Sequence, residues 1–316
     1  MFGPLRPPRA SSKRDWVRPL VGAFVCFLLF RLAFILLYPL VEFFGGRMMG
    51  LTLGSLLSAA ISGALAMAIF ESHKLTDLGL AFRTGSRNNL LKGVLLGIGA
   101  ASLIVLVPAA LGLARFQKVP NPDVSWPAAL FVPVLLFCGA MGEEIAFRGF
   151  IMQYLARGWG MWTGIIFTGT VFGLLHGDNP GASWISDLNT VLFGILFGLG
   201  VQRTHELWLP IGIHFGWNLT LPFAGTRLSG LTIRVTGYEW KWNTGDLWSS
   251  NLNRGGNLYW SGGAYGPEAS ILTTAVIGLL LLVLWKLPLN KEWAWLLDAP
   301  VDEPLSAAQP DTPPAS

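Results

Sequence analysis

Hydrophobic residues along this chain are gathered into long runs that short polar segments separate. A helix needs about 20 mostly apolar residues to cross a membrane, and eight runs approach that length. We therefore predict an all-α fold, a polytopic transmembrane helical bundle of about eight spans. The spans are expected at roughly residues 20–41, 51–71, 90–113, 127–156, 161–177, 188–203, 207–223 and 269–287.

The polar segments set the boundaries of the predicted regions. The chain begins with a basic tail and ends with an acidic, Pro-rich tail that we expect to be largely disordered. Between the seventh and eighth spans lies a loop rich in Trp, Gly and Asn, too polar to cross a membrane. The regions are a tail (1–19), spans one to three (20–126), a core of spans four to seven (127–223), the loop (224–268), the last span (269–287) and the second tail (288–316).

Composition and charge agree with a membrane location. Hydrophobic residues make up 52% of the 316 residues and charged residues 13%, whereas soluble domains are about 25% charged. Lys and Arg collect in the first tail and beside the ends of the second, fourth, sixth and eighth spans. Such clusters mark the cytoplasmic side, so both termini are expected to be cytoplasmic. The membrane is expected to be the plasma membrane of a prokaryote. Membrane lipid is therefore an expected partner, and nucleic acid is not.

Ionisable groups inside apolar spans are costly and mark candidate functional sites. The stretch "FCGAMGEEIAFRGF" places Glu143, Glu144 and Arg148 in the fourth span. Glu144 and Arg148 are four residues apart, on one helix face, where they can pair. Glu143 lies about 100° around the helix and escapes that pair. The doublet thus offers one structural carboxylate and one that is free for chemistry.

Two further spans carry polar residues at the same four-residue spacing. Phe172 and His176 lie in "VFGLLHG", and His214 and Asn218 lie in "IGIHFGWNL". At 1.5 Å per residue, Glu143 and His176 reach about the same depth in antiparallel neighbours. His214 matches that depth only if its span begins below the membrane surface. We predict one polar site shared by the fourth, fifth and seventh spans.

These residues resemble the motifs of a known family. "EEIAFRGF" is similar to the EExxxR motif, "FGLLH" to FxxxH and "HFGWN" to HxxxN of the CPBP family, the intramembrane proteases related to CAAX prenyl endopeptidases and to the Abi group. The three motifs occur in the family's order, over about residues 127–222. A looser similarity extends to "GGAYGPE", residues 262–268.

The resemblance implies an intramembrane endopeptidase whose catalytic core is the segment 127–223. Glu143, assisted by His176, would activate a water molecule, and His214 with Asn218 would orient the substrate carbonyl and stabilise the oxyanion. From the side chains themselves, we expect neither His214 nor Asn218 to be needed for folding, since a smaller polar group could replace either without leaving a buried charge unpaired. Glu144, Arg148 and Phe172 would support the site. Family members are often called metalloproteases, and Glu143, His176 and His214 could ligate zinc, so zinc is an open candidate cofactor.

Two non-protease interpretations remain beside this one. The chain could be a non-catalytic scaffold or bacteriocin-immunity protein, or a small-solute transporter. A transporter is expected to show paired broken helices, which the sequence lacks, and a scaffold would tolerate the loss of motif residues, yet all are present. Prenylated CaaX proteins, peptide leaders and other membrane-associated proteins are all open as substrates, and the oligomeric state is open too.

Overall fold

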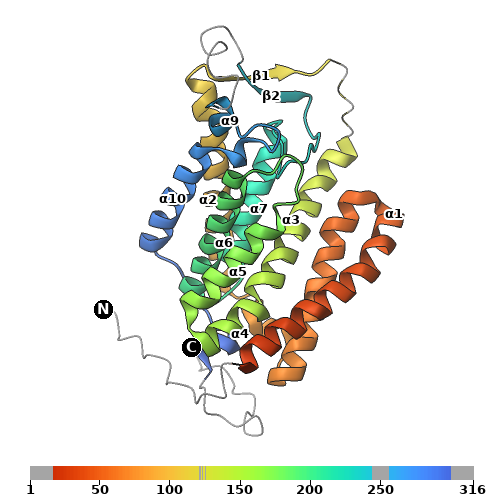
Figure 1. The fold of residues 1–316 in the computed structure, drawn as a ribbon, viewed down its shortest axis with the longest axis vertical. Helices are drawn as coiled ribbons and strands as arrows, with labels where there is room; N and C mark the ends of the chain where they lie inside the picture. The colour runs from red at the N-terminus through yellow and green to blue at the C-terminus, as the bar shows by residue number, and fades with distance from the viewer. Residues whose placement is uncertain (1–16, 121, 123, 125, 244–255, 300–316) are drawn as a thin grey trace.

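The computed structural model describes residues 17–120, 122, 124, 126–243 and 256–299; most of the predicted first tail and residues 300–316 of the second lie outside this part. The described chain forms an elongated helical bundle (Figure 1). Its helices are α1 (Val17–Glu71), α2 (Thr84–Ala110), α3 (Trp126–Arg148), α4 (Phe150–Trp159), α5 (Met161–Leu175), α6 (Trp184–Thr204), α7 (Trp208–Phe223), α9 (Gly256–Ser261), α10 (Ile271–Lys286) and α11 (Trp295–Asp298), with 3₁₀ turns η1 (Leu75–Leu78) and η2 (Pro267–Ala269).

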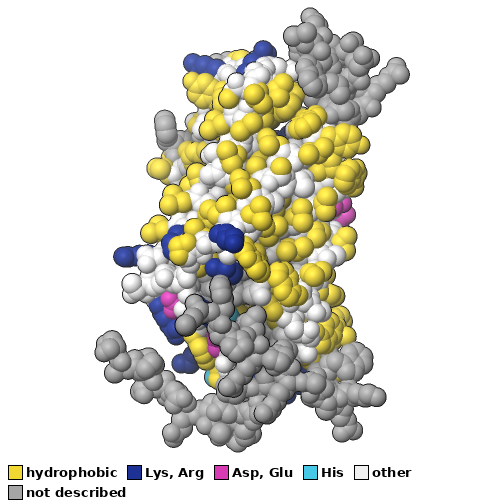
Figure 2. All heavy atoms as spheres, turned by 90° about the vertical axis from the view of Figure 1, so that its left-hand side faces the viewer, with side chains coloured by type: hydrophobic (Ala, Val, Ile, Leu, Met, Phe, Trp, Pro, Cys, Tyr) yellow, Lys and Arg dark blue, Asp and Glu magenta, His cyan; other side chains and the backbone are white. Residues whose placement is uncertain are grey.

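The predicted class, a polytopic helical membrane protein, is confirmed. Four helical segments of the described chain are long and apolar enough to cross a membrane: α1, α2, Ala129–Trp159 and α6, while α5 and α10 are shorter apolar helices. Large apolar side chains point outward on the helices, for example Leu32, Leu95 and Leu282. Figure 2 shows them spread over one face of the bundle, with Lys and Arg gathered at its upper end and in its lower half. The chain is an integral membrane protein.

Helix α1 contains the first two predicted spans as a hairpin. Gly46 breaks it with φ 77° and ψ 174°, a conformation that residues with a Cβ rarely adopt. Beyond the break the second leg runs back along the first. Two contacts show this: Gly50 faces Tyr38, and the Cys26 thiol lies 3.9 Å from the carbonyl oxygen of Ser62. The hairpin packs against α3 and α4.

The centre of the bundle is held by close contacts between small residues. Along α2 and α7, Gly93 meets Gly212, and a Cβ at Gly216 would collide with the backbone of α2 at Val94. Small residues let helix backbones approach closely in membrane proteins, where packing drives association. This contact fixes the rotation of α7, the helix that carries His214.

One end of the bundle collects the linkers and the second tail. His205 Nδ1 lies 2.7 Å from Asp298 Oδ1, and Trp295 Nε1 donates to Glu71 at 2.9 Å. The tail was expected to be largely disordered, yet its described part packs on the helices here. Between α6 and α7, Glu206 is 1% exposed, and the backbone N–H of Leu207 donates to Gly79. Helix α7 therefore begins inside the protein, which lets a short helix reach the middle of the bundle.

At the other end, two short strands form a sheet that the sequence did not predict (Figure 1). Strand β1 (Ala114–Lys118) pairs antiparallel with β2 (Tyr238–Trp242). The strands are more than a hundred residues apart, and each is too short to show an alternation of its own. They tie the described part of the Trp-rich loop to the chain that follows α2.

Candidate active site

The acidic doublet lies in the last turns of α3. Glu144 and Arg148 are both 0% exposed, and Arg148 Nη1 lies 3.5 Å from Glu144 Oε1. The guanidinium also lies 4.4 Å from the ring centre of Phe172, a cation–π contact. The predicted pairing of Glu144 with Arg148 is therefore present, and Phe172 supports it from α5.

The single fourth span expected from the sequence is divided into two helices. Helix α3 ends at Arg148 and α4 begins at Phe150. At the junction, a Cβ on Gly149 would collide with the carbonyl oxygen of Ile145. The bend follows directly after the buried ion pair, and the helix pattern of the sequence gave no sign of it.

Glu143 faces the two predicted histidines. Its Oε2 atom lies 3.9 Å from His176 Nε2 and 3.7 Å from His214 Nε2, and its side chain is 34% exposed. His176 directly follows the last residue of α5, and His214 lies two turns into α7. The convergence of three helices on one polar site is thus present, and the depth of His214, in doubt from the sequence, is explained by the buried start of α7.

Hydrogen bonds at Nδ1 decide how both imidazole rings present Nε2. His176 Nδ1 lies 2.8 Å from the carbonyl oxygen of Phe172. A carbonyl only accepts, so this nitrogen carries the proton. His214 Nδ1 lies 2.9 Å from Glu144 Oε1, a carboxylate already paired with Arg148. Both rings therefore direct Nε2 toward Glu143.

The contact between His214 and Glu144 corrects an expectation from the sequence. Glu144 was assigned only to the support of the helix, and His214 was expected to be dispensable for folding. Instead Glu144 holds His214 and Arg148 together, with all three side chains buried. Removing the imidazole would take a donor from a buried carboxylate, so His214 also contributes to stability.

Asn218 lies one turn beyond His214 on α7 and lines the same cavity. Among the described residues, no hydrogen bond to its side-chain amide is recorded, although neighbouring polar side chains have such partners. The amide is thus available to a bound molecule. With it, all four residues assigned to catalysis from the sequence meet in one place.

The cavity that joins these residues has a volume of about 690 Å³. Its walls come from both legs of α1, from α3, α5, α6 and α7, and from the loop after α7. Most of the lining is apolar, with Phe172, Phe193 and Phe197 among the rings. Three charged residues on its walls were not singled out from the sequence: Arg31, Arg47 and Glu268.

Glu268 follows "GGAYGP", the stretch that carried the looser similarity. It is 8% exposed, accepts a hydrogen bond from Trp217 Nε1 at 2.9 Å and accepts two more from the backbone and hydroxyl of Ser229. Burial raises the pKa of its carboxyl group, while these donors and His176 oppose the rise. Asn189 donates to its backbone carbonyl at 2.7 Å. Glu268 thus fastens the chain before α10 to α6, α7 and the loop over the cavity.

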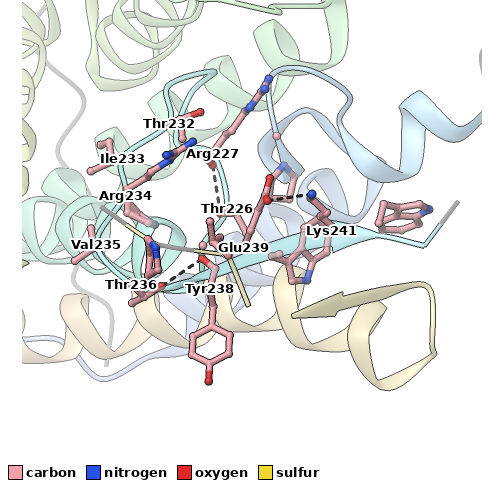
Figure 3. Close-up of a pocket in the computed structure, with 18 of the residues that line it drawn as sticks. Thr226, Arg227, Thr232, Ile233, Arg234, Val235, Thr236, Tyr238, Glu239 and Lys241 are labelled. Carbon is pink, nitrogen blue, oxygen red and sulfur yellow. Dashed lines mark hydrogen bonds and ion pairs between the residues drawn. The ribbon is translucent and has the colours of Figure 1, made fainter. Parts of the chain in front are cut away.

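Figure 3 shows a second pocket, of about 410 Å³, between the loop after α7 and strand β2. Three basic side chains line it, Arg227, Arg234 and Lys241, and Lys241 pairs with Glu239 at 3.1 Å. Thr232 lines both this pocket and the larger cavity, so its loop separates the two. The histidines and carboxylates predicted for catalysis line the larger cavity, which we take as the reaction site.

Zinc was the cofactor considered from the sequence, with Glu143, His176 and His214 as ligands. Zinc holds such nitrogen and oxygen atoms about 2.0–2.2 Å away in a tetrahedral arrangement. Within the described part of the chain, no group of three or more His, Cys, Asp or Glu side chains has the arrangement of a metal site. Zinc therefore stays an expectation from the sequence, and no step of the proposed reaction uses a metal.

The fold and the site define a polytopic membrane protein with a carboxylate–histidine centre among its helices, as in intramembrane proteases. Residues 125–220 match the family model of the Rce1-like type II CAAX prenyl endopeptidases. The matched segment contains all seven residues singled out from the sequence, and it confirms the similarity to CAAX-type intramembrane proteases. No curated protein matches the chain. Arg31 and Glu268 lie outside the matched segment.

Proposed function

We propose that this protein is an intramembrane endopeptidase that hydrolyses a peptide bond of a membrane-associated substrate with a glutamate-activated water. The observation that carries the proposal is the placement of Glu143 Oε2 at 3.9 and 3.7 Å from the Nε2 atoms of His176 and His214. These separations exceed a hydrogen bond and suit a water that bridges polar groups.

In the proposed reaction, Glu143 and His176 hold and activate the water. Its oxygen attacks the carbonyl carbon of the scissile bond, and Glu143 takes the proton that is released. The same proton then passes to the departing amine as the carbon–nitrogen bond breaks. His176 can accept from water at Nε2 because its Nδ1–H is held by the carbonyl of Phe172.

His214 and Asn218 are proposed to bind the carbonyl oxygen as negative charge develops on it. Asn218 offers an amide N–H to the cavity. His214 donates from Nε2 when its ring is doubly protonated, and the Glu144 carboxylate at Nδ1 balances that charge. A positioned oxyanion donor typically contributes a factor of about 10²–10³ in kcat.

The substrate and its approach follow from the lining of the cavity. The apolar walls suit a lipidated or membrane-inserted peptide, and prenylated CaaX proteins, peptide leaders and other membrane-associated proteins are all substrates of this kind. We also propose that the end holding the start of α1 and helix α11 faces the cytoplasm of a prokaryotic cell, since Lys and Arg are concentrated toward that end.

The experiment uses purified wild type in detergent with three labelled peptides: a farnesylated CaaX peptide, a bacteriocin-type leader peptide and a single-span transmembrane peptide. Reactions run in H₂¹⁸O. Mass spectrometry should find one ¹⁸O in the new carboxylate of at least one cleaved peptide, and Glu143→Gln should abolish that product while remaining folded. A non-catalytic scaffold or a transporter would leave all three peptides intact, and that result would overturn the proposal.

A further inference from the structure

Arg31 is a charged residue in the first leg of α1 that the mechanism does not use. It lines the same cavity as Glu143 and His176. It is exposed, yet its neighbours along the leg, "FLLFRLAFILL", are apolar. Among the described residues, no hydrogen bond or ion pair to its guanidinium is recorded. Charged groups within membrane helices ordinarily face a partner or a water-filled cavity.

The packing of the hairpin places Arg31 near the depth of the reaction site. The two legs run antiparallel, with Cys26 beside Ser62 and Gly50 beside Tyr38, so Arg31 lies across from residue 57. At that level the second leg touches α3: a Cβ on Gly142 would lie 2.7 Å from the backbone nitrogen of Leu56. Gly142 directly precedes Glu143. Arg31 is also fourteen residues, about 21 Å at 1.5 Å per residue, from the start of α1.

The carboxylates on the cavity wall are already engaged elsewhere. Glu143 faces the two histidines, and Glu268 accepts from Trp217 and Ser229. A second arginine of the cavity, Arg47, lies at the bend of the hairpin. It differs from Arg31, because it shares that end with the Tyr38–Glu42 pair. Among the described residues that line the middle of the cavity, Arg31 therefore carries a positive charge with no negative partner.

We propose that Arg31 binds a carboxylate of the substrate and thereby positions the scissile bond against Glu143. A guanidinium presents donors in a planar fork that matches a carboxylate. The carboxylate has two sources, the free C-terminus of the substrate chain or an acidic side chain near the scissile bond. An extended segment covers about 3.3–3.6 Å per residue, so the carboxylate lies within a few residues of that bond. This subsite rests on the proposed function.

The test uses the panel peptide that wild type cleaves fastest, made in three forms: with a free C-terminal carboxylate, with a C-terminal carboxamide, and with its acidic side chains changed to the amides. Wild type should prefer either the free carboxylate or the acidic side chains by about 10- to 100-fold in kcat/KM, as expected for a hydrogen bond between charged groups. Arg31→Gln should erase that preference chiefly through KM. Arg31→Lys should restore part of it.

Arg87→Gln is the matched control, since Arg87 is an exposed arginine on α2 outside the cavity lining. Arg87→Gln should keep the wild-type preference, and every variant should have the same melting temperature as wild type. Equal cleavage of the three forms by wild type would overturn the subsite while the proposed function stands. The subsite would also be overturned, with the proposed function left standing, if Arg47→Gln rather than Arg31→Gln removes the preference. It would likewise be overturned if the preference appears only when the micelle contains anionic lipid. Cleavage of none of the panel would overturn the proposed function and the subsite with it.

Discussion

Glu143 and Glu144 are adjacent in the sequence, and replacing each one separately by Gln should have opposite consequences. Glu144→Gln removes the negative charge beside Arg148 and leaves His214 only a neutral amide oxygen as its acceptor. Glu143→Gln removes a carboxylate whose Oε2 has no hydrogen-bond partner in the described structure. The same chemical change at neighbouring positions thus separates support of the fold from catalysis.

The magnitude for Glu144→Gln follows from its surroundings. Breaking a buried ion pair by removing one partner costs about 3–5 kcal/mol, and both side chains are 0% exposed. The lower end applies, because the 3.5 Å separation is long and Arg148 keeps its contact with the ring of Phe172. At roughly 2 °C per kcal/mol for a chain of this size, a loss of about 3 kcal/mol lowers Tm by about 6 °C. Glu143→Gln should leave Tm unchanged or slightly raised.

The assay is thermal unfolding of both variants in one detergent, beside cleavage of the preferred peptide at a temperature where both are folded. Glu143→Gln should be inactive, although its Tm equals that of wild type. Glu144→Gln should melt at a lower temperature and retain reduced activity, since His214 loses its charged hydrogen-bond acceptor. Equal melting temperatures would refute the assignment of Glu144 to the fold, and full activity of Glu143→Gln would refute its assignment as the base.

Asn218→Ala should lower kcat by about 10²–10³-fold with Tm unchanged, whereas His214→Ala should also lower Tm; steady-state kinetics and melting of both variants check this. Dialysis against a zinc chelator should leave cleavage intact, and activity lost to the chelator and restored by zinc would contradict the metal-free mechanism. Burial raises the pKa of Glu206 against opposing hydrogen bonds from Ser86 and Asn89. The contribution of Glu206 to stability is therefore complete below its unfolded-state pKa and is lost as pH rises through its folded-state pKa. Between these two pKa values, the Tm of Glu206→Gln relative to wild type should rise with pH, whereas the relative Tm of the exposed control Glu239→Gln should not.

The sequence by itself determined the helices and much of the site. Apolar runs of sufficient length predict spans because the membrane leaves the backbone few alternatives to a helix. The four-residue spacing of Glu144 and Arg148 determined their pairing, since it places both on one helix face. The same local geometry left Glu143 free, and it put Phe172 beside His176 and His214 beside Asn218. Each of these inferences depends on residues within one turn of a helix.

Contacts between distant segments were decided only by the tertiary structure. The bond from His214 to Glu144 joins residues seventy positions apart, and it depends on the rotation of α7 that its glycine contacts with α2 impose. The β1–β2 pairing, the bend at Gly149 and the meeting of Arg31 and Glu268 at one cavity likewise have no local pattern. Periodicity reports which face of a helix is polar, but the partner of that face depends on how the helices pack.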